Sequence, residues 1–155
     1  MLTIDRDDLS GASTQALLAL HLKGMHENSP PGAVFALDWS GLKAPGVTVW
    51  TARHDGETLG MASLKELGDG SGELKSMRTR PDALRQGIAA ALLERVIEEA
   101  RSRSLTRISL ETGSGPAFEP ALALYRKRGF VDGGAFGDYE KSAFNQFLHL
   151  DLKDA

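Results

Sequence analysis

The fold of this 155-residue chain is decided by residues 79–93, whose sequence is TRPDALRQGIAAALL. The stretch has the pattern of a strand end, a loop, and a helix that begins at Gly87 and continues with small residues. A helix N-terminus carries backbone N–H groups without intrahelical partners and a partial positive charge. Because Gly87, Ala89 and Ala90 have little or no side chain, an anion could approach these donors closely. Small residues at a helix start more often serve packing, so the stretch alone leaves both interpretations open.

Polar side chains flank this helix start. Arg80, Arg85 and Gln86 would add side-chain donors beside an anion. Two familiar phosphate-binding patterns, GxxxxGK[ST] and GxGxxG, are absent. Their absence argues against ordinary nucleotide hydrolysis and against NAD binding.

Segments on both sides of this stretch alternate between strand and helix patterns. The predicted strands cover residues 47–53, 58–67, 73–79, 105–111, 130–132 and 145–152. The predicted helices cover residues 13–25, the long segment that begins at Gly87, and residues 119–128, with a short helical or irregular piece at 33–42. Turn residues between the first three strands favour an antiparallel meander. The order predicts one domain over residues 1–155, with a mixed α/β (α+β) sheet covered by helices.

Composition excludes several classes of function. The chain has no cysteine, a net charge of −3, and ordinary globular proportions of 41% hydrophobic and 25% charged residues. A slightly acidic chain is a poor partner for nucleic acid, which requires a basic face. No apolar run approaches a membrane span or a secretory signal, so we expect a cytoplasmic protein that does not bind membranes. The histidines are scattered without the spacing of a metal site, so we expect no metal.

Two motifs in the same order resemble those of the GNAT N-acetyltransferase superfamily. The coenzyme A pyrophosphate loop of that family is written Q/R-x-x-G-x-G/A, and residues 87–89 match its second half, with Pro81 at a position where proline is frequent. Leu84 stands where Gln or Arg is usual, and Arg85 follows it. Residues 121–130, ALALYRKRGF, are similar to the A-x-x-L-Y-x-x-x-G-F signature. The resemblance covers roughly residues 47–152.

The resemblance implies a particular sheet and a particular co-substrate. The strands at 73–79 and 105–111 would be parallel and would splay apart at one end, and the pantetheine arm of acetyl-CoA would fill the gap and bond to the exposed strand edge. Backbone groups of the earlier strand would hold pantetheine, and the loop and helix start would hold pyrophosphate. The implied coenzyme-binding residues are Met77, Arg78, Thr79, Arg85, Gln86, Gly87, Ile88, Ala89 and Ala90.

The reaction implied by the resemblance is direct transfer of the acetyl group to an amine. A backbone N–H near Met77 would stabilise the oxyanion of the tetrahedral intermediate. The resemblance points to Glu73 as the base that takes the proton of the amine, with Glu111 or water as alternatives. It points to Tyr125 as the acid that protonates the departing thiolate. A solvated strand end for the carboxylates and a core position for Tyr125 remain the structural alternatives.

The acceptor is assigned only to a class. We expect an N-acetyltransferase that acts on a primary amine of a small molecule. A protein lysine or N-terminal acetyltransferase, and a non-catalytic sensor of acyl-CoA, remain alternatives.

Three further features are left open. His21 is expected to be partly buried, and it could also line the wall of the acceptor pocket. Residues 126–128, all basic, are assigned either to the 3′-phosphate of coenzyme A or to a solvated helix end. Pairing into a homodimer is also left open.

Overall fold

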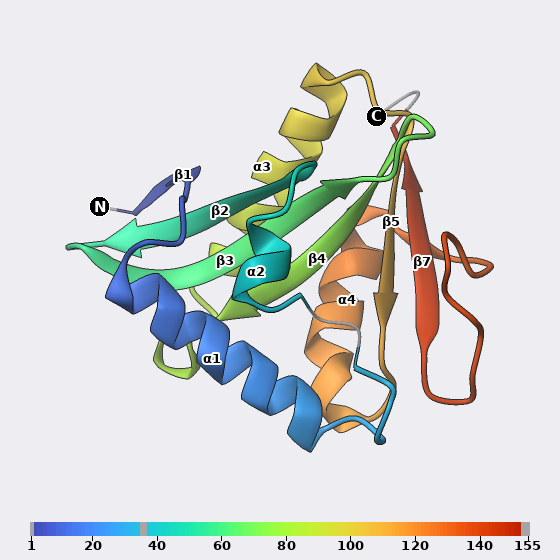
Figure 1. The fold of residues 1–155 in the computed structure, drawn as a ribbon, viewed down its shortest axis with the longest axis horizontal. Coiled ribbons are helices and arrows are strands. Elements are labelled where there is room, and N and C mark those ends of the chain that lie inside the picture. The colour runs from blue at the N-terminus through green and yellow to red at the C-terminus, as the bar shows by residue number, and fades with distance from the viewer. Residues whose placement is uncertain (1, 35–36, 153–155) are drawn as a thin grey trace.

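Seven strands form one sheet in the residues that the computed structural model describes, 2–34 and 37–152 (Figure 1). The strands are β1 (Thr3–Arg6), β2 (Val47–His54), β3 (Glu57–Glu66), β4 (Ser71–Thr79), β5 (Arg107–Thr112), β6 (Val131–Asp132) and β7 (Gln146–Asp151). Their order in the sheet is β1-β2-β3-β4-β5-β7-β6, and β4 runs parallel to β5 while the other neighbours are antiparallel. The predicted mixed α/β sheet, with a meander followed by a parallel pair, is confirmed.

Helices cover both faces of the sheet. They are α1 (Ala12–Glu27), α2 (Trp39–Leu42), α3 (Ile88–Ser102) and α4 (Glu119–Arg128), with single 3₁₀ turns η1 (Pro81–Ala83) and η2 (Pro116–Phe118). In Figure 1, α1 crosses in front of the sheet and α3 lies behind it. Leu17, Leu18 and Met61 belong to the smaller core under α1. The larger core joins α3 and α4 to the other side of the sheet.

The long helix α3 forms because its apolar residues recur on one face. Ile88, Leu92 and Val96 are each at most 2% exposed and face the sheet. A Cβ on Gly60 of β3 would lie 2.8 Å from the side chain of Ile88, so the absent side chain lets helix and sheet approach closely. Helix α4 has the predicted bounds and ends at Gly129, whose φ of 112° is favourable for glycine alone among ordinary residues.

The N-terminal strand β1 was not predicted from the sequence. It has four residues, of which Ile4 alone packs against the core, while Asp5 and Arg6 are exposed. Its place at the sheet edge comes from pairing with β2, a tertiary contact that leaves no periodic signal. The helical piece expected at 33–42 is confined to α2, and residues 35–36 lie outside the described residues.

None of the helices in the described ranges combines the length and the hydropathy needed to cross a bilayer.

Candidate active site

The parallel strands β4 and β5 separate after a short contact. They pair at Ser71–Arg107, Gly72–Ile108 and Glu73–Ser109 only, although β4 continues to Thr79. On its other side β5 pairs with β7 over its whole length, from Arg107–Asp151 to Thr112–Gln146. The edge of β4 that faces β5 is therefore left without a strand partner beyond Glu73. The predicted splay of these two strands is present.

A cavity of about 530 Å³ occupies this opening. It is lined by the end of α1, the second half of β4, the loop to α3, the first turn of α3, the end of β5 and one side of α4. Eight of the nine residues predicted to bind the coenzyme line this cavity; Gln86 does not. Leu84, at the mismatched position of the loop motif, lines it too and is 56% exposed.

The loop before α3 presents backbone donors to the cavity. Arg85 and Gly87 have φ of 65° and 78°, and the first intrahelical bond runs from Ala91 N to Gly87 O. The N–H groups of Ile88, Ala89 and Ala90 thus have no acceptor within the helix. No atom lies within 4 Å of the place where a Cβ on Gly87 would sit. An anion has access to these donors, so the loop fits a diphosphate group.

Strand β4 contains a bulge where the cavity begins. Met61 pairs with Arg78 and Ser63 pairs with Lys75, so β4 has one residue more than β3 between these two pairs. Ser76 takes up the extra length with φ of 52°. A bulge leaves the extra residue outside the ladder and re-aims the neighbouring groups. The bulge thus alters the backbone around Met77, where the oxyanion donor was predicted.

Tyr125 lies on α4 and lines the cavity. Its ring packs against Phe130 with centroids 5.8 Å apart, and the residue is 7% exposed. Burial raises the pKa of Tyr125 to about 12, and the positive charge of Arg78 partly opposes this effect. Tyr125 therefore keeps its phenolic proton at neutral pH. The structural alternative and the catalytic prediction are compatible, because the ring is part of the core and the residue also borders the cavity.

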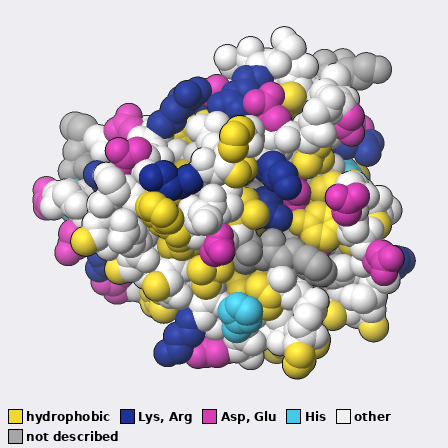
Figure 2. Space-filling view, in the orientation of Figure 1, with side chains coloured by type: hydrophobic (Ala, Val, Ile, Leu, Met, Phe, Trp, Pro, Cys, Tyr) yellow, Lys and Arg dark blue, Asp and Glu magenta, His cyan; other side chains and the backbone are white. Residues whose placement is uncertain are grey.

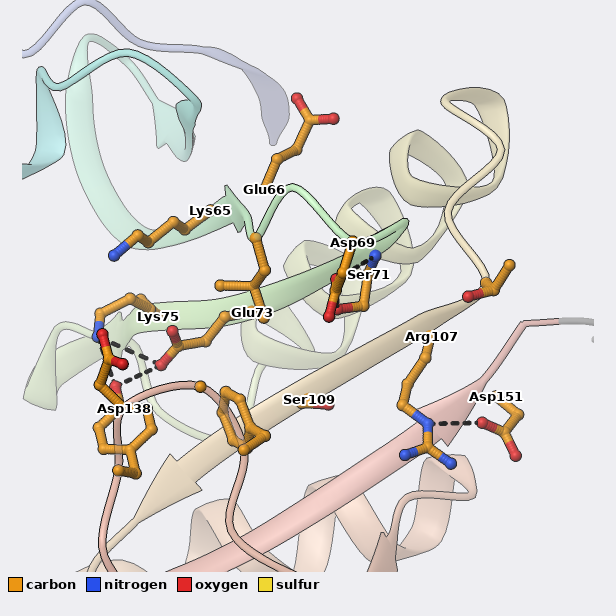
Figure 3. Close-up of a pocket in the computed structure, with 15 residues that line it drawn as sticks. Lys65, Glu66, Asp69, Ser71, Glu73, Lys75, Arg107, Ser109, Asp138 and Asp151 are labelled. Carbon is orange, nitrogen blue, oxygen red and sulfur yellow. Dashed lines mark hydrogen bonds and ion pairs between the residues drawn. The ribbon is translucent and has the colours of Figure 1, made fainter.

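Glu73 is held by two donors that the sequence did not single out together. Its Oε2 accepts from the hydroxyl of Tyr139 at 2.5 Å and from Lys75 Nζ at 3.2 Å, and Lys75 Nζ also donates to the Tyr139 oxygen at 2.8 Å (Figure 3). Burial and the hydrogen bond to Glu73 raise the pKa of Tyr139 above its usual value. Glu73, Lys75 and Tyr139 line both the cavity and a second hollow of about 1080 Å³ beside it.

Sequence reasoning missed Tyr139 because it lies in the irregular segment before β7. That segment has no periodicity, and nothing in it predicts contact with β4, 66 residues earlier. The one available signal was its rarity, since the chain has two tyrosines.

Glu111 lies at the end of β5 and also lines the cavity. The pKa of Glu111 is raised to about 7, chiefly by burial; the positive charge of Lys75 and a hydrogen bond from Asn145 oppose the shift, and the negative charge of Glu73 adds to it. The two carboxylates considered as the base are thus electrostatically coupled neighbours in different environments.

His21 and Arg78 form a second polar contact in the cavity wall. Arg78 Nε donates to His21 Nδ1 at 3.0 Å. Burial, and secondarily the charge of Arg78, lower the pKa of His21 to about 4, so the imidazole is neutral at physiological pH. His21 therefore is a buried residue, as expected, and also lines the cavity.

Charges are mixed on one face of the molecule. In Figure 2 basic and acidic side chains are interleaved on the visible face. Within residues 2–34 and 37–152, no group of three or more His, Asp or Glu side chains is arranged to hold a metal ion.

Comparisons with known proteins agree with this geometry. The family model described as the acetyltransferase (GNAT) family matches residues 14–130. The chain is 43% identical to the uncharacterised N-acetyltransferase YedL of Escherichia coli, over 98% of this chain and 96% of that one. It is 42% identical to the uncharacterised N-acetyltransferase YsnE of Bacillus subtilis, over 92% and 94%. A structure from Klebsiella pneumoniae, proposed to be an acyl-CoA N-acyltransferase, superposes with a TM-score of 0.82 at 28% identity and covers 98% of both chains.

The splayed strands, the loop with free helix-start donors, and these matches lead to one assignment: the chain belongs to the GNAT family and is an acetyl-CoA-dependent N-acetyltransferase.

Proposed function

We propose that the protein transfers the acetyl group of acetyl-CoA directly to the primary amine of a small molecule. The observation that carries the proposal is the convergence of three groups on one cavity: the unpaired edge of β4, the Glu73–Glu111 pair and the protonated Tyr125. Acetyl-CoA supplies an acetyl group on an activated thioester, and the chain supplies orientation and proton acceptors and donors around it.

The coenzyme is proposed to bind along β4 and at the start of α3. Backbone groups of residues 77–79 would hold the pantetheine arm as an added strand is held. Arg85 and the backbone N–H groups of residues 87–90 would hold the pyrophosphate, because these donors have no partner within the helix. Gln86 does not line the cavity, so its side chain is the weakest of the nine predicted contacts.

Glu111 is proposed as the group that takes the proton of the amine. An alkylammonium has a pKa of about 10.4 and is not a nucleophile until it loses its proton. A base whose pKa lies near the working pH is the most effective acceptor, and Glu111 has a pKa of about 7. Glu73 is held by Lys75 and Tyr139, and its negative charge raises the pKa of Glu111. The resemblance instead predicts Glu73 as the base. Variants at both positions distinguish the two hypotheses.

Tyr125 and the backbone of Met77 are proposed to act on the thioester. The Met77 N–H would donate to the oxyanion as the amine attacks the carbonyl carbon. Tyr125 would donate its hydroxyl proton to the sulfur as the carbon–sulfur bond breaks. Its raised pKa supports this role, because the hydroxyl remains protonated and available at neutral pH.

A small acceptor is favoured over a protein acceptor by the charges around the site. The larger hollow beside Glu73 is lined by three basic and five acidic side chains, and two of the acidic ones, Glu73 and Asp151, are paired with Lys75 and Arg107 of the same lining. A groove for lysine-containing peptides would be expected to be acidic rather than mixed. Pairing of the enzyme into a homodimer stays a prediction.

A thiol-release assay tests the proposed function. The purified protein is incubated with acetyl-CoA, a panel of primary amines and a free-thiol reagent, and release is compared with and without each amine. We expect release that depends on both protein and amine. Release with histone-type or ribosomal peptides alone would favour a protein acetyltransferase instead, and no amine-dependent release with any acceptor would reject the proposal.

A further inference from the structure

Arg78 is a cation in the cavity wall that has no acidic partner among the described residues. Its side chain extends from β4 to α1, where Nε donates to His21 Nδ1 at 3.0 Å and Nη2 donates to the His21 backbone oxygen at 3.4 Å. In the described parts of the chain no carboxylate forms an ion pair with its guanidinium, and burial lowers the pKa of Arg78.

This lack of a partner distinguishes Arg78 from most arginines of the protein. Arginines that do pair with carboxylates are Arg6, Arg53, Arg80, Arg95, Arg103, Arg107, Arg126 and Arg128. Arg6, Arg107 and Arg126 are more exposed to solvent than Arg78. Burial lowers the pKa of Arg78. Burial of a charge without a counter-charge is unfavourable, so such a group in a cavity is suited to bind an anion.

We propose that Arg78 binds a carboxylate of the acceptor, so that the enzyme acetylates amines that also carry a carboxylate, as amino acids do. The inference rests on the proposed function and names the substrate class of the same cavity. A guanidinium is well matched to this role, because its planar fork can donate two parallel hydrogen bonds to one carboxylate.

His21 orients Arg78 for this contact. Its neutral ring accepts from Nε through Nδ1, and its backbone oxygen accepts from Nη2, so one residue of α1 fixes the guanidinium plane. Because the pKa of His21 is lowered to about 4, it does not add a competing positive charge at neutral pH. His21 is therefore a positioning residue that acts through Arg78.

The position of Arg78 favours an acceptor carboxylate over a phosphate of the coenzyme. The donors for pyrophosphate lie at the start of α3, whereas the Arg78 side chain contacts α1. Arg78 directly follows Met77, the proposed oxyanion donor, and its charge influences the hydroxyl of Tyr125, the proposed proton donor. In an α-amino acid a single carbon separates amine and carboxylate. A carboxylate at Arg78 would thus hold the amine close to the reacting thioester.

The test compares acceptors that differ only in the carboxylate. Thiol release is measured with glycine, with the L-amino acids other than proline and cysteine, with β-alanine and 4-aminobutyrate, and with the carboxamide of each. We expect at least one acid to have a kcat/KM roughly 10- to 100-fold above that of its amide, the range of a hydrogen bond to a charged group. Equal use of acid and amide by the unaltered enzyme would overturn the inference while leaving the proposed function intact.

Variants assign the effect to Arg78. Arg78→Gln should lower the ratio of kcat/KM for the acid to kcat/KM for the amide by the same factor, and should change the KM for acetyl-CoA by less, because the backbone of residue 78 is retained. Arg78→Lys should be intermediate, since it keeps the charge without the fork. Arg6→Gln, at an arginine whose side chain is 61% exposed on β1, is the matched control and should change nothing. A rise in the KM for acetyl-CoA with intact acid selectivity would assign Arg78 to the coenzyme and overturn the inference.

His21 is tested by loss and rescue of selectivity. His21→Leu removes the acceptor for Nε and should lower the acid-to-amide ratio, whereas His21→Asn keeps an acceptor and should preserve most of it. Equal ratios in both variants would exclude a positioning role for His21. Should the Arg78 variants fail to fold, the acid-to-amide ratio of the unaltered enzyme still decides the inference. A complete lack of amine-dependent thiol release would reject the inference together with the proposed function.

Discussion

The contact between β2 and β3 and the contact between β4 and β5 belong to the same sheet but differ in extent. The first pairs continuously from Val47–Lys65 to His54–Glu57 apart from one bulge, and the second stops after Glu73–Ser109. In the closed contact the backbone groups bond to each other, and the side chains fill the two cores. In the open contact the backbone of β4 and the carboxylates of Glu73 and Glu111 face a cavity. One sheet thus provides stability at one contact and a binding site at the other.

The largest expected effect comes from a negative charge placed at the start of α3, where the opening between β4 and β5 meets the proposed pyrophosphate site. Gly87→Glu should abolish coenzyme A binding, because it puts bulk and negative charge against the helix-start donors. No atom within 4 Å would obstruct the new side chain, so the fold should survive apart from the roughly 1 kcal/mol cost of a positive φ. Isothermal titration calorimetry with coenzyme A measures the loss.

The matched control lies at the closed contact. Gly56, in the turn between β2 and β3, has φ of 79°, close to the 78° of Gly87, and the space around it is equally open. Gly56→Glu should therefore cost the same backbone strain and leave coenzyme binding unchanged. Normal affinity in Gly87→Glu would contradict the placement of the pyrophosphate.

A cavity in the core beside the β2–β3 contact should destabilise the protein without changing the coenzyme site between β4 and β5. Leu64 on β3 is fully buried, and Leu64→Ala should lower the free energy of unfolding by about 3 kcal/mol. Urea denaturation measures the change, and coenzyme affinity below the transition should stay the same. Leu20→Ala, at a leucine on α1 that is 38% exposed, is the control with little expected effect. A marked loss of affinity in Leu64→Ala would mean that the two contacts are coupled.

Removal of the Tyr125 hydroxyl should lower turnover much more than it lowers coenzyme affinity. Tyr125→Phe should lower kcat by roughly 100-fold, at the low end of the range for proton transfer catalysis, because it removes the proposed proton donor. The ring contact with Phe130 is retained, so stability and coenzyme affinity should change little. Stopped-flow or steady-state thiol release gives kcat, and calorimetry gives the affinity. Unchanged turnover would reject the acid role.

The smallest expected effects are shifts of the pH profile. With Glu111 as the base, kcat/KM should fall about tenfold per pH unit below about 7 and level off above it, because the protonated carboxyl cannot accept a proton. Glu111→Gln is the reference for these shifts: it removes the proposed base itself and should abolish the limb together with most of the activity. Rates measured from pH 5 to 9 provide the profile.

Two further variants shift the limb in opposite directions. Glu73→Gln removes a negative charge that raises the pKa of Glu111, so the limb should move to lower pH. Lys75→Met removes a positive charge that lowers this pKa, so the limb should move to higher pH. A limb that persists in Glu111→Gln and disappears in Glu73→Gln would assign the base to Glu73.

The sequence predicted the parts of the site that lie within continuous segments. Small residues and turn signals mark the loop before α3, and the segment that contains Tyr125 was found through its resemblance to a family signature of fixed spacing. Contacts between distant segments left no such mark. Tyr139 reaches Glu73 from a loop without periodicity, and β1 is a strand because β2 offers it an edge.

The sequence by itself determined that a helix with free N-terminal donors follows a strand, because capping and periodicity are local properties of the chain. Tertiary structure decided what the polar groups around that feature do. Glu73 and Glu111 are both glutamates near strand ends, yet the buried Glu73 accepts hydrogen bonds from two donors, whereas desolvation of the half-buried Glu111 raises its pKa to about 7. The reason is physical: the proton affinity of a carboxyl group depends on its solvation and on neighbouring charges, and distant parts of the chain supply both.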